Sequence, residues 1–388
     1  MKQNLRLLSL LAAVMLVLGA CGGSGTETTT APTGTTEAGA TTSAGDDTTT
    51  TAGEETTTTA AAATDVQVGL IFDTTGRGDQ SFNDSAAAGI DRAAAELGIT
   101  FTEAVPNADG SNRAELLQLA ADSSDFVLGI GFLFEGDAAA VGIENPDVNF
   151  AVVDSAMLDF EVDPPVPYAD NIAGLVFAEH QGSFLVGAIA ALKSTTGTIG
   201  FIGGVSGVGG LIERFEAGYV AGATAVNPDV EILSEYISSA PDFAGFNAPD
   251  RAKDIALAMY EGGADIVYHA AGGSGGGLFE AAKEQSDATG TKVWAIGVDS
   301  DQYNTADEGV REFILTSMLK RVDVAVYEAI KSHIDGTFAP GPITYDLSVD
   351  GVGYSTTGGF VDDVVDQIED FKAQIVSGEI VVNPLALP

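Results

Sequence analysis

The feature that most constrains this chain is a repeated alternation of short apolar runs with longer segments of helical spacing. Residues 66–72 form the first near-continuous apolar run, and residues 81–97 then carry Ala and Ile at helical spacing. Strands that are apolar throughout, rather than at every second residue, are typical of parallel sheets covered on both faces. The pattern therefore predicts an α/β protein with doubly wound, mainly parallel sheets.

The same alternation continues through the chain and divides into two series. Further strand candidates are residues 126–130, 150–153, 172–177, 198–202, 230–233, 265–268, 292–298 and 313–319. Helical patterns cover residues 214–225, 252–261, 322–334 and 361–375. A looser proline-rich stretch at residues 164–167 separates the two series. We therefore expect two lobes.

The first 20 residues have the pattern of a secretory signal. Lys2 and Arg6 precede an apolar stretch that is too short to span a membrane. The sequence Leu-Gly-Ala-Cys at residues 18–21 resembles the bacterial lipoprotein cleavage box, in which the cysteine is lipidated. The alternative is a plain signal peptide followed by an incidental cysteine. A lipidated Cys21 would anchor a soluble domain to the extracytoplasmic face of the cell membrane without spanning it.

A threonine-rich segment follows Cys21. Residues 22–64 include 18 Thr and six acidic residues, but no Lys, Arg or aromatic residue. Such a composition buries too little apolar surface to offset the entropy of ordering, so we expect residues 21–64 to form a disordered tether. Its Ser/Thr content also suits an O-glycosylated stalk.

The charge balance excludes several classes of partner. The chain has 16 basic and 56 acidic residues, a net charge of −40, and residues 65–388 alone carry −36. Nucleic-acid binding needs a basic surface, so we expect no nucleic-acid partner. A salt-adapted host is the favoured reason for so acidic a surface. One cysteine and three scattered histidines predict no internal disulfide and no Cys-rich or His metal site. No cofactor is expected.

Polar residues and glycines follow several predicted strands. Ligands of open parallel sheets bind beyond the carboxyl ends of the strands. Those positions hold Asp73, Asp154, Asp299, the glycines at residues 203–204, and residues 269–273. We therefore expect a polar cleft that the backbone approaches closely.

One glycine-rich motif has the form of an enzyme's nucleophile turn. Residues 272–276 read Gly-Gly-Ser-Gly-Gly between a strand and a helix, and Asp299 and His333 follow in the chain order of hydrolases. A glycine-rich strand-to-helix turn equally suits backbone contacts to a ligand. A serine esterase using Ser274 is therefore kept only as an alternative. No dinucleotide-binding or Walker A motif is present.

The segment from residue 69 to residue 83 carries three candidate ligand contacts. Asp73 follows the first strand, and Phe82 and Asn83 open the next helix. An aromatic ring facing a cleft can stack on a planar ligand, and an amide can donate and accept hydrogen bonds. From the residues alone, Phe82 is equally compatible with a place in the core.

Several segments together resemble the basic membrane protein family of lipoproteins. These are residues 73–83, 200–204, 214–219, 264–273, 293–302 and 315–323. The resemblance extends from Val66 to Pro388. It implies a substrate-binding component of an ABC transporter with a two-lobed type I periplasmic-binding fold and three crossovers. The lobes expected are residues 65–170 plus 320–343, and residues 171–319 plus 344–388.

The resemblance also implies a ligand site for a purine nucleoside. Phe82 matches one aromatic stacking position, with Asp73 and Asn83 beside it, and Asp154 matches an acid that reads the base. Tyr268 is the best match for the second aromatic, and His269 is the competing assignment. Asp299 and Lys320 match ribose-binding groups, and Gly272 and Gly273 would approach the sugar through their backbone.

The resulting expectation is a monomeric, lipid-anchored receptor that is not an enzyme. It would capture inosine, guanosine or adenosine between its lobes and deliver the nucleoside to an ABC permease. A family member that binds a different small ligand is the main alternative.

Overall fold

The computed structural model describes residues 64–385; residues 1–63 and 386–388 are not described. The predicted signal segment, Cys21 and all but the last residue of the predicted tether lie outside the described residues. Among the helices of residues 64–385, none is long and apolar enough to cross a bilayer.

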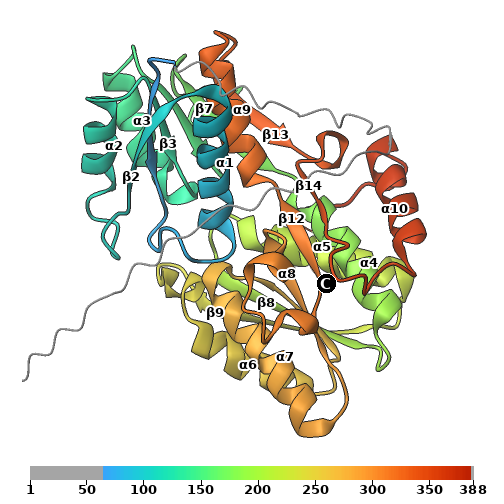
Figure 1. The fold of residues 1–388 in the computed structure, drawn as a ribbon. Coiled ribbons are helices and arrows are strands. Elements are labelled where there is room, and N and C mark those ends of the chain that lie inside the picture. The colour runs from blue at the N-terminus through green and yellow to red at the C-terminus, as the bar shows by residue number, and fades with distance from the viewer. Residues whose placement is uncertain (1–63, 386–388) are drawn as a thin grey trace, which may run out of the picture. The chain divides into compact units, whose positions relative to one another are not determined.

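The first lobe is built on a six-stranded sheet in which every neighbouring pair is parallel. Its strand order is β13-β7-β4-β3-β1-β2. The strands are β1 (Gln67–Ile71), β2 (Thr100–Ala104), β3 (Phe126–Gly129), β4 (Asn149–Val153), β7 (Ile172–Phe177) and β13 (Gly341–Tyr345). Helices α1 (Phe82–Leu97) and α9 (Val322–Ile334) cover one face, and α2 (Arg113–Ala121) and α3 (Glu135–Glu144) cover the other (Figure 1).

The second lobe is built on another six-stranded sheet, in the order β14-β12-β11-β10-β8-β9. Only β14 is antiparallel to its neighbour. The strands are β8 (Thr198–Ser206), β9 (Glu231–Ser239), β10 (Ile266–Ala270), β11 (Trp294–Asp299), β12 (Ile314–Lys320) and β14 (Val352–Tyr354). Helices α4 (Glu179–Lys193), α5 (Leu211–Val226) and α10 (Val365–Ser377) lie on one side of this sheet, and α6 (Pro249–Glu261) and α7 (Gly275–Thr289) on the other.

Two short elements lie outside these layers. Strands β5 (Leu158–Asp159) and β6 (Val166–Pro167) form an antiparallel pair in the first lobe. The single-turn helix α8 (Gln302–Thr305) follows β11 in the second lobe.

Close helix packing in the second lobe depends on glycines. A Cβ atom on Gly187 of α4 would lie 2.1 Å from the carbonyl oxygen of Tyr219 in α5. A Cβ atom on Gly222 of α5 would lie 1.9 Å from the carbonyl oxygen of Phe184 in α4. Any larger residue at either position would force the two helices apart.

Residues 64–385 pass between the sheets three times, which confirms the predicted two-lobed fold with three crossovers. The passages lie between β7 and α4, between β12 and α9, and between β13 and β14. The lobe boundaries need correction. β7 pairs with β4 and β13 in the first sheet, so the first passage comes near residue 178 and not residue 170. Lys320 ends β12 in the second sheet, and β13 keeps residues 344–345 in the first.

The local sequence pattern could not have assigned β7 to one of the two sheets. Its run is buried on both faces, and such a run fits equally well into either sheet. The sequence also failed to predict β2, an edge strand whose side chains are mostly exposed and which lacks an apolar run.

Candidate ligand-binding site

A cavity lies between the two lobes, at the carboxyl ends of strands from both sheets. It holds about 650 Å³ of space free of protein atoms, part of it open to solvent. Eight of the nine predicted ligand contacts line it: Asp73, Phe82, Asn83, Asp154, Gly272, Gly273, Asp299 and Lys320.

Asp73 presents a carboxylate from the end of β1. Its Oδ1 atom accepts a hydrogen bond from the backbone N–H of Thr74 at 2.7 Å. Burial raises the pKa of Asp73, and the Thr74 hydrogen bond opposes that shift. No basic side chain forms an ion pair with Asp73 among the described residues. A ligand that donates an N–H or O–H to Asp73 would therefore offset part of its desolvation.

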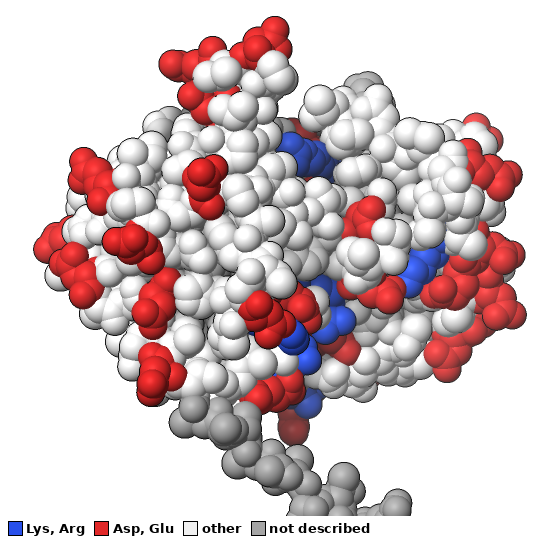
Figure 2. Space-filling view, turned by 90° about the horizontal axis from the view of Figure 1, so that it is seen from above, with Lys and Arg blue, Asp and Glu red and all other residues white. Residues whose placement is uncertain are grey.

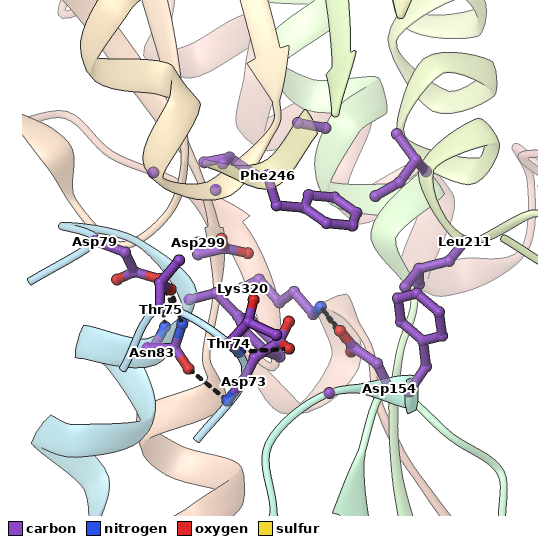
Figure 3. A pocket seen from close by; sticks show the side chains of 18 of the residues that line it. Asp73, Thr74, Thr75, Asp79, Asn83, Asp154, Leu211, Phe246, Asp299 and Lys320 are labelled. Carbon is purple, nitrogen blue, oxygen red and sulfur yellow. Dashed lines mark hydrogen bonds and ion pairs between the residues drawn. The ribbon is translucent and has the colours of Figure 1, made fainter. Parts of the chain in front are cut away.

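Asn83 lines the cavity but uses its amide within the protein. Its Nδ2 atom donates to Thr75 Oγ1 at 2.9 Å and to Asp79 Oδ2 at 3.0 Å. Its Oδ1 atom accepts from the backbone N–H of Asp73 at 3.1 Å. Asn83 therefore fixes the loop that carries Asp73, and both of its N–H donors are already occupied (Figure 3).

Asp79 lines the cavity and was not predicted. Its carboxylate accepts hydrogen bonds from the backbone N–H groups of Ser81, Asn83 and Asp84, at 2.8–3.1 Å. Asp79 therefore accepts hydrogen bonds from backbone N–H groups at the start of α1 that have no partner within the helix, and it fixes the position of Phe82, the first residue of α1. An acid just before a helix start is the capping signal that could have identified it.

A buried ion pair joins the lobes within the cavity. Lys320 Nζ lies 2.6 Å from Asp154 Oδ1, and their side chains are 2% and 5% exposed. Burial alone would lower the pKa of Lys320, but the charges of Asp154, Asp299 and Glu179 raise it above its usual value. Nζ also lies 4.9 Å from the centre of the Phe82 ring. Lys320 thus holds a fixed charge beside the predicted stacking residue.

Asp154 and Asp299 share an uncommon backbone conformation. Asp154 follows β4 with φ 66°, and Asp299 ends β11 with φ 63°. Such left-handed non-glycine residues cluster at functional sites. Burial raises the pKa of Asp299 to about 6, although the charge of Lys320 opposes the shift. Asp299 Oδ2 accepts a 2.6 Å hydrogen bond from Ser81 Oγ of the other lobe.

Tyr268 is not in the cavity, so its assignment as the second aromatic is wrong. Its ring is fully buried in the core of the second lobe, 5.2 Å from the ring centre of Tyr219 and 5.6 Å from that of Phe201. His269 is equally buried. Because β10 is covered on both faces, side chains within the strand point into one core layer or the other and not beyond its end.

Phe246 lines the cavity from the second lobe instead. It lies in the turn after β9, and its half-buried ring projects over the space above Lys320 (Figure 3). Gly204 makes room for that ring, since a Cβ atom there would lie 2.6 Å from Phe246 Cδ1. Phe132, just after β3, lines the cavity from the first lobe. Phe132 comes shortly after the end of β3, which is the signal that could have identified it, whereas Phe246 ends the 3-10 helix Phe243–Phe246 and carries no such signal.

Gly272 and Gly273 bring the backbone to the cavity wall. Gly272 has φ 54°, a conformation that favours glycine. A Cβ atom on Gly273 would lie 3.6 Å from the Asp79 Cβ atom of the other lobe. The small residues let the lobes meet closely at this edge of the cavity.

Ser274 cannot act as a nucleophile in this arrangement. Its hydroxyl is fully buried, donates to the carbonyl of Gly245 at 2.8 Å and accepts from the N–H of Ala248 at 2.7 Å. His333 lies in the first lobe, where its Nδ1 atom contacts the Asn149 amide. The esterase alternative is therefore wrong: Ser274 ties the turn before α6 to the start of α7.

Acidic groups dominate the cavity and the surface. The cavity holds the carboxyl groups of Asp73, Asp79, Asp154 and Asp299 against the single ammonium of Lys320. Figure 2 shows acidic side chains spread over the visible face, with the basic ones lying beside them. Residues 64–385 contain no group of three or more His, Cys, Asp or Glu that could hold a metal ion.

The fold and this cavity define a two-lobed binding protein of the type I periplasmic-binding class. The family model of PnrA-like ABC transporter substrate-binding proteins (Bmp) matches residues 66–385. The chain belongs to this family, whose members are solute-binding receptors of ABC transporters rather than enzymes. A model of the new glue protein family matches residues 1–83, too small a part of the chain to show membership.

Individual relatives agree with the family match. The chain is 33% identical over 331 residues to the ABC transporter nucleoside-binding protein BmpA of Lactococcus lactis, covering 82% of this chain and 89% of that protein. It is 34% identical over 321 residues to basic membrane protein A of Borreliella burgdorferi, covering 81% and 87%. A solved solute-binding protein of an Aeropyrum pernix ABC transporter is 29% identical, with a TM-score of 0.68, covering 82% and 94%.

Proposed function

We propose that this receptor binds a purine nucleoside, with the base held between Phe82 of the first lobe and Phe246 of the second. The observation that carries the proposal is that these two half-buried rings line one cavity from opposite lobes. Stacking on an aromatic side chain contributes about 1–3 kcal/mol per base. A planar base between the rings contacts both lobes at once and thereby favours their closure.

Asp73 is the acceptor proposed for the base. Its half-buried carboxylate forms no ion pair among residues 64–385, so a donor on the ligand can add to the one hydrogen bond that it accepts from Thr74. A purine bearing an N–H on its ring or on an exocyclic amine supplies one. Asn83 supports this role by holding the Asp73 loop, in place of the direct base contact predicted from the sequence.

Asp299 and Lys320 are the groups proposed for the sugar. One oxygen of Asp299 is engaged by Ser81, and the other is available to accept a hydroxyl hydrogen. Acidic side chains accept from ribose hydroxyls in the same way in dinucleotide-binding folds. Lys320 can donate to a sugar oxygen while it remains paired with Asp154. The backbone of Gly272 and Gly273 lies at the same wall.

The negative charge of the cavity indicates which charge its ligand can carry. Asp73, Asp79 and Asp299 outnumber the one ammonium that Asp154 already neutralises. A phosphate group would meet like charges in a partly enclosed space of low dielectric, which is unfavourable. A neutral nucleoside avoids this repulsion, so nucleosides rather than nucleotides are the proposed ligands.

Anchoring and delivery complete the proposal. Family membership implies a membrane permease that receives the solute. The Leu-Gly-Ala-Cys sequence at residues 18–21 supports lipidation of Cys21, which would hold the receptor, as a monomer, at the extracytoplasmic face of the membrane. Mass spectrometry of the protein purified from membranes would detect a diacylglyceryl group on Cys21 or show it to be absent.

Calorimetric titration of the full chain tests the ligand. The titrants are inosine, guanosine, adenosine and cytidine, with inosine monophosphate as the charge control, each at low and high salt. We expect saturable binding of purine nucleosides, weaker binding of cytidine and little binding of the nucleotide. Folded, ligand-free protein that gives no heat with any nucleoside would reject the nucleoside proposal and direct the search to ligands without a planar base.

A further inference from the structure

His269 is a buried histidine that the ligand site does not use. It lies on β10 with no exposed surface, and its Nε2 atom is 3.0 Å from Oε1 of Gln302 at the start of α8. The ring packs against Gly275, where a Cβ atom would lie 2.0 Å from His269 Cε1. Only a glycine at position 275 leaves space for the imidazole ring of His269, so we asked what this ring does besides filling the core.

The contacts fix the orientation of the Gln302 amide. Gln302 Oε1 also accepts a hydrogen bond from the backbone N–H of Val298 at 2.8 Å. Because a backbone N–H can only donate, this atom must be the amide oxygen, and His269 must donate to it through Nε2–H. Burial lowers the pKa of His269 to about 4, which keeps the ring neutral. A Cβ atom on Gly297 would lie 2.7 Å from the same oxygen, so no larger residue fits there.

With its oxygen held in this way, the amide nitrogen of Gln302 reaches the first lobe. Nε2 donates to the carbonyl oxygen of Gln80 at 3.1 Å. Thr305 Oγ1 donates to the same carbonyl at 3.1 Å, and Ser300 Oγ donates to the carbonyl of Ser81 at 3.0 Å. Gln80 has φ 56°, an uncommon conformation for this residue type.

This turn is the part of the first lobe next to the stacking ring. Ser81 donates to Asp299 in the second lobe and directly precedes Phe82. Holding the Gln80–Ser81 turn against the second lobe therefore sets the position of Phe82 relative to Asp299. The contacts lie between the lobes, so separating the lobes would break them.

We propose that His269 is a positioning residue for lobe closure: through Gln302 it builds a hydrogen-bonded latch on the Gln80–Ser81 turn. The latch acts on closure whichever solute is bound, so it goes beyond the proposed nucleoside ligand. It would slow opening of the closed receptor, and hence ligand release, rather than alter the first encounter with ligand.

The test compares four variants of the full chain. His269→Phe keeps a ring but removes the donor, and Gln302→Met removes the amide while keeping the side chain's length. His269→Gln restores an N–H donor near the position of Nε2. His333→Phe is the matched control, because it removes a histidine contact within the first lobe, where Nδ1 lies 3.0 Å from Asn149 Nδ2.

Two readouts separate the latch from the proposed ligand. The first is hydrogen exchange of the amides of residues 80–83, followed by mass spectrometry, which needs no ligand. The second is the dissociation rate of inosine by stopped flow. We expect faster exchange at this turn and roughly tenfold faster dissociation in His269→Phe and Gln302→Met, as the loss of one or two hydrogen bonds implies, with little change in association rate. His269→Gln should recover most of both effects.

Exchange at residues 80–83 that is the same in Gln302→Met, His333→Phe and the parent would overturn the latch. Exchange that is faster throughout the second lobe in His269→Phe, with no recovery in His269→Gln, would also overturn it, because that result indicates a purely structural role. A parent protein that binds no inosine rejects the nucleoside proposal alone, since the exchange measurement still decides the latch.

Discussion

The ammonium of Lys320 and the carboxylate of Asp154 lie 2.6 Å apart, almost fully buried, and belong to different lobes. Lys320 ends β12 beside one of the three passages between the lobes, whereas Asp154 follows β4. Burying the pair costs the desolvation of both charges. Its main effect is therefore to destabilise any arrangement in which the two groups are separated or in which one of them is buried alone. The pair therefore ties the lobes together at the base of the cavity.

Replacing one partner of this pair should be costly. We expect Lys320→Met to lower the free energy of unfolding by about 3–5 kcal/mol, because it leaves the Asp154 carboxylate buried without a counter-charge. The double variant Asp154→Asn/Lys320→Met should recover much of the loss. Urea denaturation followed by circular dichroism measures both. Lys283→Met breaks an exposed pair with Asp287 on α7 and serves as control, with an expected effect of about 0–1 kcal/mol. Equal losses for Lys320→Met and Lys283→Met would contradict the prediction.

The two rings that face the cavity should matter more to binding than to folding. We expect Phe82→Ala and Phe246→Ala each to weaken inosine binding by about 1–3 kcal/mol, since each removes one stacking surface. Tyr268→Phe is the control: it removes a hydroxyl that lies 3.2 Å from Ser183 Oγ in the core, so it should change stability and leave affinity unaltered. Isothermal titration calorimetry of the three variants with inosine measures these affinities. Unchanged affinity in both Phe82→Ala and Phe246→Ala would show that these two rings do not stack on the base.

Binding should depend on the ionisation of Asp299. Burial raises the pKa of Asp299 to about 6, and hydroxyl donors of a bound sugar would favour its carboxylate form. Affinity for inosine should therefore be constant above about pH 7 and fall as the pH drops through 6, because the protonated acid must first lose its proton. In Asp299→Asn the affinity should be weaker at pH 7.5 and nearly flat between pH 5 and 7.5. If the parent's affinity is flat over the same range, Asp299 does not accept from the ligand.

Stability should respond to Glu179, a buried acid at the start of α4. Burial raises the pKa of Glu179 to about 7, against the opposing charge of Lys320. The unfolded chain loses this proton near the ordinary value of 4.5, so the folded state is penalised increasingly as the pH rises from about 4.5 to 7. Glu179→Gln should therefore gain stability relative to the parent over that window and show a constant difference above it.

Chemical denaturation at pH 5 and pH 8 gives the required comparison for Glu179. The exposed residue Glu235 on β9 provides the control: Glu235→Gln should differ from the parent by the same small amount at both pH values. The prediction is contradicted if the stability of Glu179→Gln, relative to that of the parent, falls between pH 5 and pH 8. That result would show that the ion pair of Glu179 with Arg214 stabilises the fold by more than the burial of the carboxylate destabilises it.

Much of the architecture could be predicted because buried parallel strands and their covering helices leave a local signature. The run at residues 172–177 was identified as a strand at its observed bounds, and residues 322–334 as a helix. The strand-end rule also brought Asp73, Asp154 and Asp299 to one cavity, since carboxyl ends of parallel strands meet at the same edge of a sheet.

The sequence by itself thus determined the α/β class and the strand-end acids of the cavity, because both depend on short-range patterns. Only the tertiary structure decided that β7 belongs to the first sheet and that Phe246, not Tyr268, faces the cavity. It also decided that the Asn83 amide is used within its own loop. These outcomes depend on which buried surfaces pack together and on what lies within hydrogen-bond reach across the fold, and such long-range relations leave no periodic trace along the chain.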